Sequence, residues 1–193
     1  MIAKTDNSSL ESKLMLRRYF LQRYHSGPLS VLDCCEGDGL IWHVLGREFE
    51  IAQRLGFDIK AGTGGRLRMD SRRFLRTGNW ARFDVVDIDS YGSPWGHWMA
   101  LLVRGAKRSL TVFLTVGLTR VCGGNMAAEM SCALGLDQLR RRVPMGLHTN
   151  TLNQLGVTYL LAEAHRYGYR YEAIAESSPS ANARYVGVRL CPS

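Results

Sequence analysis

The fold is decided by one stretch near the N-terminus, Leu29-Ser30-Val31-Leu32-Asp33-Cys34-Cys35-Glu36-Gly37-Asp38-Gly39. The apolar residues at its start predict a short buried strand over residues 29–33. The acids and glycines that follow lead directly into an apolar-periodic segment, which predicts a helix over residues 40–49. A strand that turns through glycines into a helix is typical of α/β sheets, whose ligands bind at the carboxyl ends of the strands.

Strands and helices alternate along the rest of the chain. Upstream, leucines at helical spacing predict a helix that begins with a Ser8–Glu11 capping box and ends before Gly27-Pro28. The remaining apolar patterns predict strands over 54–59, 66–69, 83–88, 110–116, 169–175 and 184–190, and helices over 70–77, 98–107 and 149–167. A polar turn separates the last two strands, so they are expected to form an antiparallel hairpin.

This order predicts an α/β fold, a Rossmann-like, doubly wound and mostly parallel seven-stranded sheet that ends in an antiparallel C-terminal hairpin. We expect a single domain over residues 1–193, with the N-terminal helix in 1–28. The segment 118–148 is too long for a simple connection, so it is interpreted as an insertion after the fifth strand.

Composition restricts the class of protein. The chain has 193 residues, 46% hydrophobic and 22% charged, as in ordinary globular domains. It shows no signal-peptide pattern and no apolar run near the roughly 18 residues of a membrane span, so we expect a cytoplasmic protein without a membrane partner. Its five cysteines and five histidines are spaced like neither a disulfide framework nor a metal site, and no metal is expected.

The charge is strongly positive. Lys and Arg number 25 against 17 acids, giving a net charge of +8 and a pI near 9.5. Most of this positive charge is arginine, whose planar guanidinium binds phosphate in a bidentate manner. An anionic partner is therefore favoured, with nucleic acid as the leading candidate.

The loop at residues 33–39 suits a cationic ligand. A nicotinamide-binding loop would read Gly-x-Gly-x-x-Gly, but Trp42 stands at the third glycine position. The acids Asp33, Glu36 and Asp38 would repel a diphosphate and attract a ligand that carries an amine and a sulfonium.

This loop resembles motif I of the class I S-adenosylmethionine (SAM) dependent methyltransferases. The resemblance implies that SAM is the cofactor and that its methionine part and sugar are held by Asp33, Glu36, Gly37 and Gly39. It also implies that Asp58, at the end of the second strand, accepts both ribose hydroxyls. Asp70, after the third strand, would contact the adenine amine; its alternative role is to cap the following helix, and the two roles are compatible.

The stretch Phe83-Asp84-Val85-Val86-Asp87-Ile88-Asp89-Ser90-Tyr91-Gly92-Ser93-Pro94 supplies the candidate catalytic groups. An apolar run here ends in a carboxylate, a hydroxyl, an aromatic ring and a glycine, which together suit a planar amine. The Asp89 carboxylate and the Ser90 backbone carbonyl are expected to accept N–H hydrogen bonds, while Tyr91 stacks on the acceptor ring.

This stretch resembles motif IV of amino-methyltransferases. It is most similar to the Asp-x-Asp-Pro-Phe/Tyr-Gly-Ser-Pro motif of the tRNA N2-guanosine dimethyltransferase family. Two features depart from that family: Ser90 replaces its rigid proline, and the chain is too short for its C-terminal RNA-binding domain.

The resemblance and the charge together predict a SAM-dependent methyltransferase that modifies an exocyclic amine of a base in RNA, with DNA as the less favoured partner. Substrate binding is assigned to Trp95, Arg72, Arg73 and Arg140, with a position in the core as the alternative for Trp95. Two alternatives remain: a non-catalytic SAM-fold module that binds nucleic acid or a partner subunit, and a small-molecule SAM-dependent enzyme. Oligomeric state is not predicted.

Overall fold

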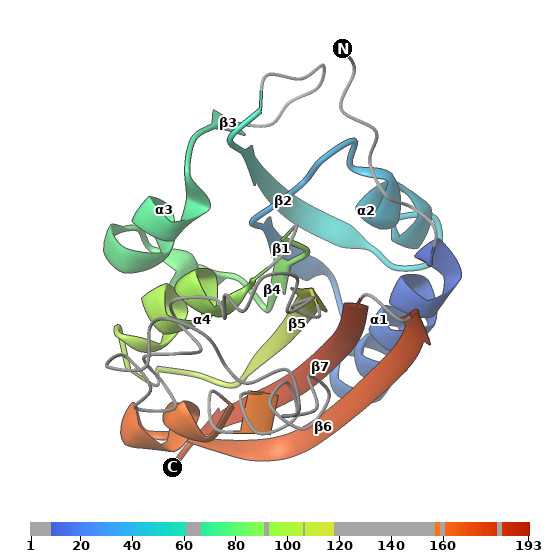
Figure 1. Cartoon of the computed structure of the whole chain (residues 1–193). Coiled ribbons are helices and arrows are strands. Elements are labelled where there is room, and N and C mark those ends of the chain that lie inside the picture. The colour runs from blue at the N-terminus through green and yellow to red at the C-terminus, as the bar shows by residue number, and fades with distance from the viewer. Residues whose placement is uncertain are drawn as a thin grey trace, which may run out of the picture.

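A computed structural model gives the fold and describes residues 9–60, 67–90, 93–105, 107–117, 157–158, 161–180 and 183–193 (Figure 1). Of side chains 178–180 nothing is described. The predicted insertion 118–148 and the predicted site residues Tyr91 and Arg140 lie outside this part of the chain.

Seven strands form one sheet in the order β3-β2-β1-β4-β5-β7-β6. Their bounds are β1 Leu29–Asp33, β2 Ile51–Asp58, β3 Leu67–Arg68, β4 Val85–Ile88, β5 Leu110–Gly117, β6 Tyr169–Ser180 and β7 Ala183–Pro192. The first five strands pair in parallel, while β7 pairs antiparallel with both β5 and β6. This is the class I methyltransferase form of the Rossmann-like fold, as the alternation and the C-terminal hairpin predicted.

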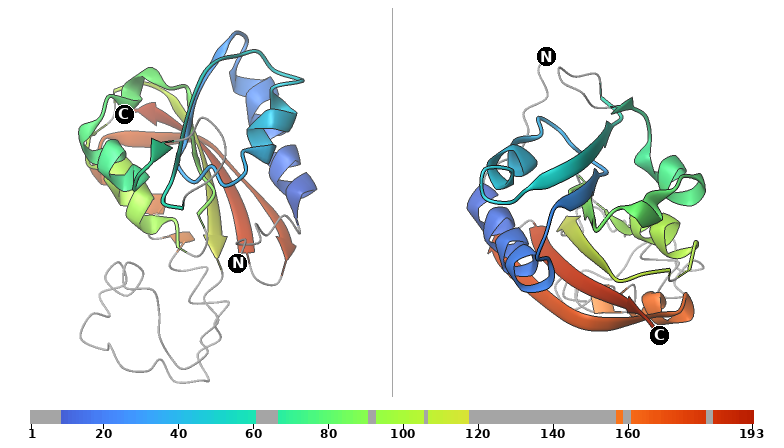
Figure 2. Two further views of the ribbon diagram at one scale, coloured as in Figure 1. Left: turned by 90° about the horizontal axis from the view of Figure 1, so that it is seen from above. Right: turned by 180° about the vertical axis from the view of Figure 1, so that it is seen from behind.

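Helices cover both faces of the sheet. The helices α1 Leu10–Tyr24 and α2 Leu40–Leu45 lie on one face, and α3 Ser71–Thr77 and α4 Trp95–Leu102 lie on the other (Figures 1 and 2). A short 3₁₀ helix, η1 Trp80–Arg82, precedes β4. Residues 157–158 and 161–166 are also helical, within the helix predicted over 149–167. The buried residues accordingly form two cores, one on each side of the sheet.

Several predicted boundaries are wrong by a few residues. Helix α4 begins at Trp95, directly after Pro94, rather than at residue 98. Because of this earlier start, the side chains of both Trp95 and Trp98 lie in the core. The N-cap of α1 is Ser9, which makes no side-chain capping bond, and Ser8 lies outside the described residues. Strand β2 starts three residues earlier than predicted, at Ile51, because it pairs along the whole of β1.

Candidate active site

The carboxyl ends of three parallel strands meet at one edge of the sheet. Asp33 at the end of β1 is in register with Gly56 of β2 and with Asp87 of β4. Two backbone bonds continue these pairings into the loop after β1: the Cys34 amide donates to the Asp87 carbonyl (2.8 Å), and the Glu36 amide donates to the Phe57 carbonyl (2.9 Å). The loop is therefore fixed against both neighbouring strands at the edge where ligands of such sheets bind.

Glycines give this loop its shape. Gly37 and Gly39 have φ of 57° and 72°, a left-handed conformation that strongly favours glycine. At Gly39 a Cβ atom would also lie 2.5 Å from Nη2 of Arg54, so the space beside it is already filled. The Gly-x-Gly pattern is thus a geometric requirement of the turn into α2.

Asp58 braces the loop from the end of β2. Its Oδ2 accepts the Gly37 amide at 3.0 Å, and its Oδ1 accepts the Lys60 amide at 2.7 Å. These two backbone bonds hold the Asp58 carboxylate against the loop at the carboxyl end of β2. The predicted ribose contact is compatible with this arrangement and stays a prediction.

Glu36 holds an incompletely satisfied carboxylate above β2. Its Oε1 pairs with the Arg54 guanidinium, while its Oε2 is buried and has no hydrogen-bond partner among the described residues. A Cβ on Gly56 would fall 1.7 Å from that Oε2, so glycine leaves the room that Glu36 occupies. A buried acceptor without a donor is costly, and here it belongs to the loop predicted to bind a cofactor.

Asp33 is a buried acid without a direct partner in the described part of the chain. Its exposed fraction is 3%, and no hydrogen bond or ion pair reaches its carboxylate there. Burial, and next the neighbouring Asp87, raise the pKa of Asp33 well above the usual range, whereas Arg54 opposes the shift. A ligand that brings positive charge would remove this penalty, so the observation fits the cationic end of SAM.

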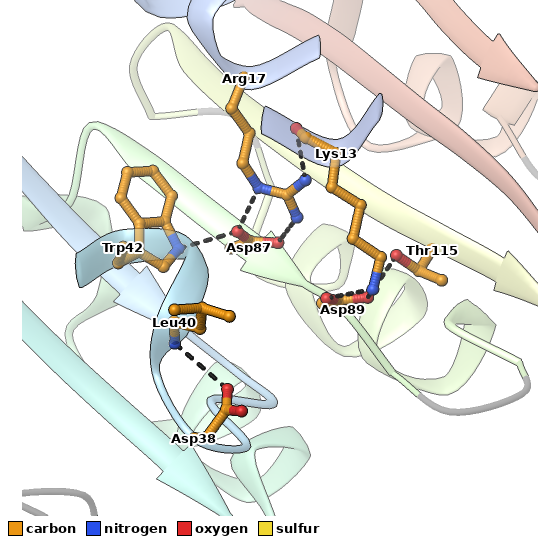
Figure 3. A network of polar contacts seen from close by, with 8 residues as sticks. All are labelled: Lys13, Arg17, Asp38, Leu40, Trp42, Asp87, Asp89 and Thr115. Carbon is orange, nitrogen blue, oxygen red and sulfur yellow. Dashed lines mark hydrogen bonds and ion pairs between the residues drawn. The ribbon is translucent and has the colours of Figure 1, made fainter. Parts of the chain in front are cut away.

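Asp87, one strand over, is fully neutralised. Arg17 of α1 donates from Nε to Oδ2 (2.8 Å) and from Nη2 to Oδ1 (2.7 Å), and the Trp42 indole donates to Oδ2 (2.8 Å) (Figure 3). Although burial lowers the pKa of Arg17, the Asp87 carboxylate outweighs that effect and the net direction is upward. Trp42, which replaces the third glycine of a dinucleotide fingerprint, therefore supports this ion pair.

Asp89 is engaged in the same way by the preceding turn of α1. The Lys13 ammonium donates to Oδ1 at 2.8 Å and to Oδ2 at 2.7 Å, and the Thr115 hydroxyl of β5 donates to Oδ1 at 2.5 Å (Figure 3). Four residues of helix span about 6 Å and two residues of strand about 6.6 Å, so Lys13 and Arg17 match Asp89 and Asp87 in spacing. Three of the roughly four lone-pair sites of Asp89 are used, and one remains.

Ser90 lies next to this carboxylate and is buried. Within the described part of the chain its Oγ has no hydrogen-bond partner, which is unusual for a buried hydroxyl. A bound group that reached this hydroxyl would supply the missing hydrogen bond.

The third strand leads to a second cluster at the same edge. Asp70 is the N-cap of α3, since its Oδ1 accepts the Arg72 amide at 2.9 Å, and the Arg72 guanidinium also pairs with its carboxylate. The Ser71 hydroxyl donates to the Cys34 carbonyl at 2.7 Å, which ties α3 to the cofactor loop. His97 of α4 lies near this cluster; burial, and next Arg72, lower its pKa to about 4, so His97 is neutral at pH 7.

The predicted substrate-binding residues of the described part of the chain differ in their exposure and partners. Trp95 is 1% exposed and packs in the core, so the expectation that it stacks on a base is not supported. Arg72 is committed to Asp70, and Arg73 is exposed on the same helix. The exposed Arg73 is compatible with a phosphate contact.

Sequence reasoning missed Lys13, Arg17 and Thr115. A signal was present for the first two, because they are four residues apart and share the inward face of α1 with Leu14 and Leu21. Charged residues in such an apolar stripe indicate buried partners of opposite sign.

The part of the chain with assigned structure contains no helix long and apolar enough to cross a membrane, and in it no three His, Cys, Asp or Glu side chains are grouped to hold a metal. A cavity of about 240 Å³ lies at the amino ends of the parallel strands, near His25 and Arg189. We do not place the active site there, because the loops that carry the candidate residues are at the other ends of the strands.

No protein-family model and no curated protein matches the sequence. Solved structures do match the fold. Trm1 from Pyrococcus horikoshii, in complex with S-adenosyl-L-methionine, superposes with a TM-score of 0.66 at 16% identity over 100% of this chain and 57% of that one. The chain has the fold of the class I SAM-dependent methyltransferases. It spans little more than half of the Trm1 chain.

Further solved structures that match the chain are methyltransferases with different substrates. The Mtq2-Trm112 complex of E. cuniculi, responsible for methylation of the termination factor eRF1, matches with a TM-score of 0.57 at 14% identity over 100% of both chains. The plantazolicin methyltransferase BamL, solved with a substrate analogue and S-adenosylhomocysteine (SAH), matches with a TM-score of 0.57 at 12% identity over 96% of this chain and 86% of that one. The likeness therefore supports a SAM-binding fold and leaves the substrate open.

Proposed function

We propose that the protein is a SAM-dependent methyltransferase that methylates an exocyclic amine of a base in nucleic acid, with RNA favoured over DNA. The observation that carries the proposal is the convergence of Asp33, Asp58 and Asp89 at the carboxyl ends of β1, β2 and β4. Two of these acids lie where a cationic cofactor with a ribose is expected, and the third lies where an acceptor amine is expected.

The cofactor residues fit SAM by charge and by space. Asp33 is a buried carboxylate that a cationic ligand would neutralise, Asp58 is held beside the loop by the Gly37 amide, and Gly37 and Gly39 let the backbone adopt its left-handed turn. When bound, SAM supplies an electrophilic methyl group on a sulfonium.

Asp89 and Ser90 act on the acceptor. An aromatic amine is a weak nucleophile because its lone pair is delocalised into the ring. The free lone-pair site of Asp89 accepts one N–H, which localises electron density on nitrogen and gives the proton a destination. The Ser90 backbone carbonyl is the second acceptor for the amine, and a hydrogen bond from the Ser90 hydroxyl to a neighbouring atom of the acceptor would give that buried group a partner.

The positive charge and the exposed arginine of α3 support a polyanionic substrate. One observation also favours a second candidate, a non-catalytic SAM-fold module: Lys13 and Thr115 already occupy most of the Asp89 carboxylate. Turnover separates the two.

Calorimetry with SAM and a methyl-transfer assay test the proposal. Asp33→Ala and Asp58→Ala are expected to abolish SAM binding, while Asp89→Ala is expected to bind SAM normally and to lose turnover. Normal SAM affinity in both of the first variants would contradict the cofactor assignment. An active Asp89→Ala enzyme would show that the catalytic carboxylate lies elsewhere.

A further inference from the structure

Lys13 occupies the position in which an acceptor amine is expected. Its ammonium contacts both oxygens of Asp89 at 2.7–2.8 Å and lies 5.2 Å from the centroid of the Tyr185 ring. A carboxylate beside an aromatic face is the arrangement expected to hold an amine. In this protein that arrangement already holds one, and the residue that carries it is 7% exposed.

The packing of helix α1 fixes Lys13 at this position. One turn further on, Arg17 is 1% exposed and bonded through two nitrogens to Asp87, and its Nη1 donates to the Lys13 carbonyl at 3.0 Å. Phe20 and Leu21, in the next turn of α1, are fully buried. Withdrawing α1 would break a buried ion pair, so the positive charge of Lys13 remains at this site while an acceptor binds.

A fixed ammonium restricts which acceptors can use Asp89. A neutral N–H can take the remaining lone-pair site without an electrostatic penalty. A protonated alkyl amine at the same site would lie about 4–5 Å from the Lys13 ammonium, and the repulsion between them would largely cancel its attraction to Asp89. Without Lys13, Asp89 would be a buried, uncompensated carboxylate that attracts such a cation.

We propose that Lys13 is a specificity-determining residue that restricts the acceptor to a neutral, planar amine and excludes protonated alkyl amines such as lysine side chains, polyamines and peptide N-termini. This inference rests on the proposed function, because it takes Asp89 as the residue that meets the acceptor. It adds two things to the proposed function: the charge of the acceptor, and a role for Lys13, which lies outside both sequence motifs.

The test uses n-butylammonium, which has the shape of a lysine side chain, as a competitor of methyl transfer to the nucleic-acid pool that accepts label. Lys13→Met removes the charge and keeps the length of the side chain, and it is expected to make the enzyme roughly 10 to 100 times more sensitive to butylammonium. Lys13→Arg keeps the charge and is expected to resist like the wild type. Lys107→Met is the matched control, since it removes one exposed lysine away from the site.

Circular dichroism first checks that each variant is folded. Equal inhibition of the wild type, Lys13→Met and Lys107→Met by butylammonium would overturn the inference while leaving the proposed function intact. A second arm needs no variant: wild-type enzyme is offered nucleic acid and a lysine-rich peptide together, and label is expected only in nucleic acid. Label in the lysine amines would overturn the inference, whereas no transfer to either substrate would overturn the proposed function itself.

Discussion

Replacing Asp33 by Asn is expected to stabilise the free protein and to weaken SAM binding. In the fold, Asp33 and Asp87 are register partners on adjacent strands. Strands lie about 4.8 Å apart, and two carboxylates at that separation repel by about 3 kcal/mol at an effective dielectric constant of 20, which is an upper bound because Arg17 neutralises Asp87. Arg54 opposes part of this repulsion, so we expect Asp33→Asn to raise the free energy of unfolding by about 1–3 kcal/mol at pH 8.

The pH dependence gives the sign of this effect. The pKa of Asp33 is higher in the folded protein than its ordinary value of 3.8. The contribution of Asp33 to the free energy of unfolding is therefore fully present below pH 3.8 and is lost as pH rises through the pKa of the folded protein. The gain from Asp33→Asn is therefore expected to grow with pH. Urea unfolding of both proteins without SAM, from pH 5 to pH 8, measures it.

SAM binding is expected to change in the opposite direction. The cofactor brings the positive charge that Asp33 lacks, so its affinity for the wild type should rise with pH as Asp33 ionises. Calorimetry in buffers of different ionisation enthalpy should detect proton release on binding, and Asp33→Asn should lose both the release and at least tenfold in affinity. A variant that is less stable than the wild type, or that keeps pH-dependent SAM binding, would refute the reasoning.

Three further predictions concern neighbouring residues. Ser90→Ala should raise the unfolding free energy by about 1 kcal/mol, because it removes an orphaned hydroxyl, and should lower turnover without changing SAM affinity; unchanged turnover would deny Ser90 a substrate contact. Arg17→Met should lower the unfolding free energy by about 3–5 kcal/mol, because it leaves the buried Asp87 carboxylate without its cation. Arg18→Met, on the exposed face of α1, should have little effect in the same denaturation assay. Asp70→Ala should cost about 1 kcal/mol through loss of the α3 N-cap, and Asp70→Asn should retain most of it; equal losses would exclude capping.

The sequence predicted the order and pairing of the strands well, because their apolar runs are short and regularly separated. It also placed the loop at Gly37 and Gly39 correctly, since a left-handed turn leaves few alternatives to glycine. Trp95 was harder to place: the expected helix began at residue 98, and the earlier start of α4 after Pro94 is what buries it.

Local sequence patterns could not predict the ion pairs of the site. Lys13 and Asp89 are 76 residues apart, and buried lysines are rare enough that a surface position is the natural expectation. The orphaned hydroxyl of Ser90 likewise depends on its three-dimensional surroundings, although the replacement of proline had already marked this position. The prediction that Asp89 meets the acceptor amine therefore remains, with a cation beside it that the motif alone did not reveal.

The most direct test of the proposed function is incubation of the full chain with methyl-labelled SAM and separate pools of tRNA, rRNA and DNA, followed by nucleoside analysis. The wild type is expected to place label on an exocyclic amine of one base in an RNA pool, and Asp89→Asn is expected to bind SAM and place none. Label on carbon, on ribose, or on the same amine in the Asp89→Asn variant would contradict the account.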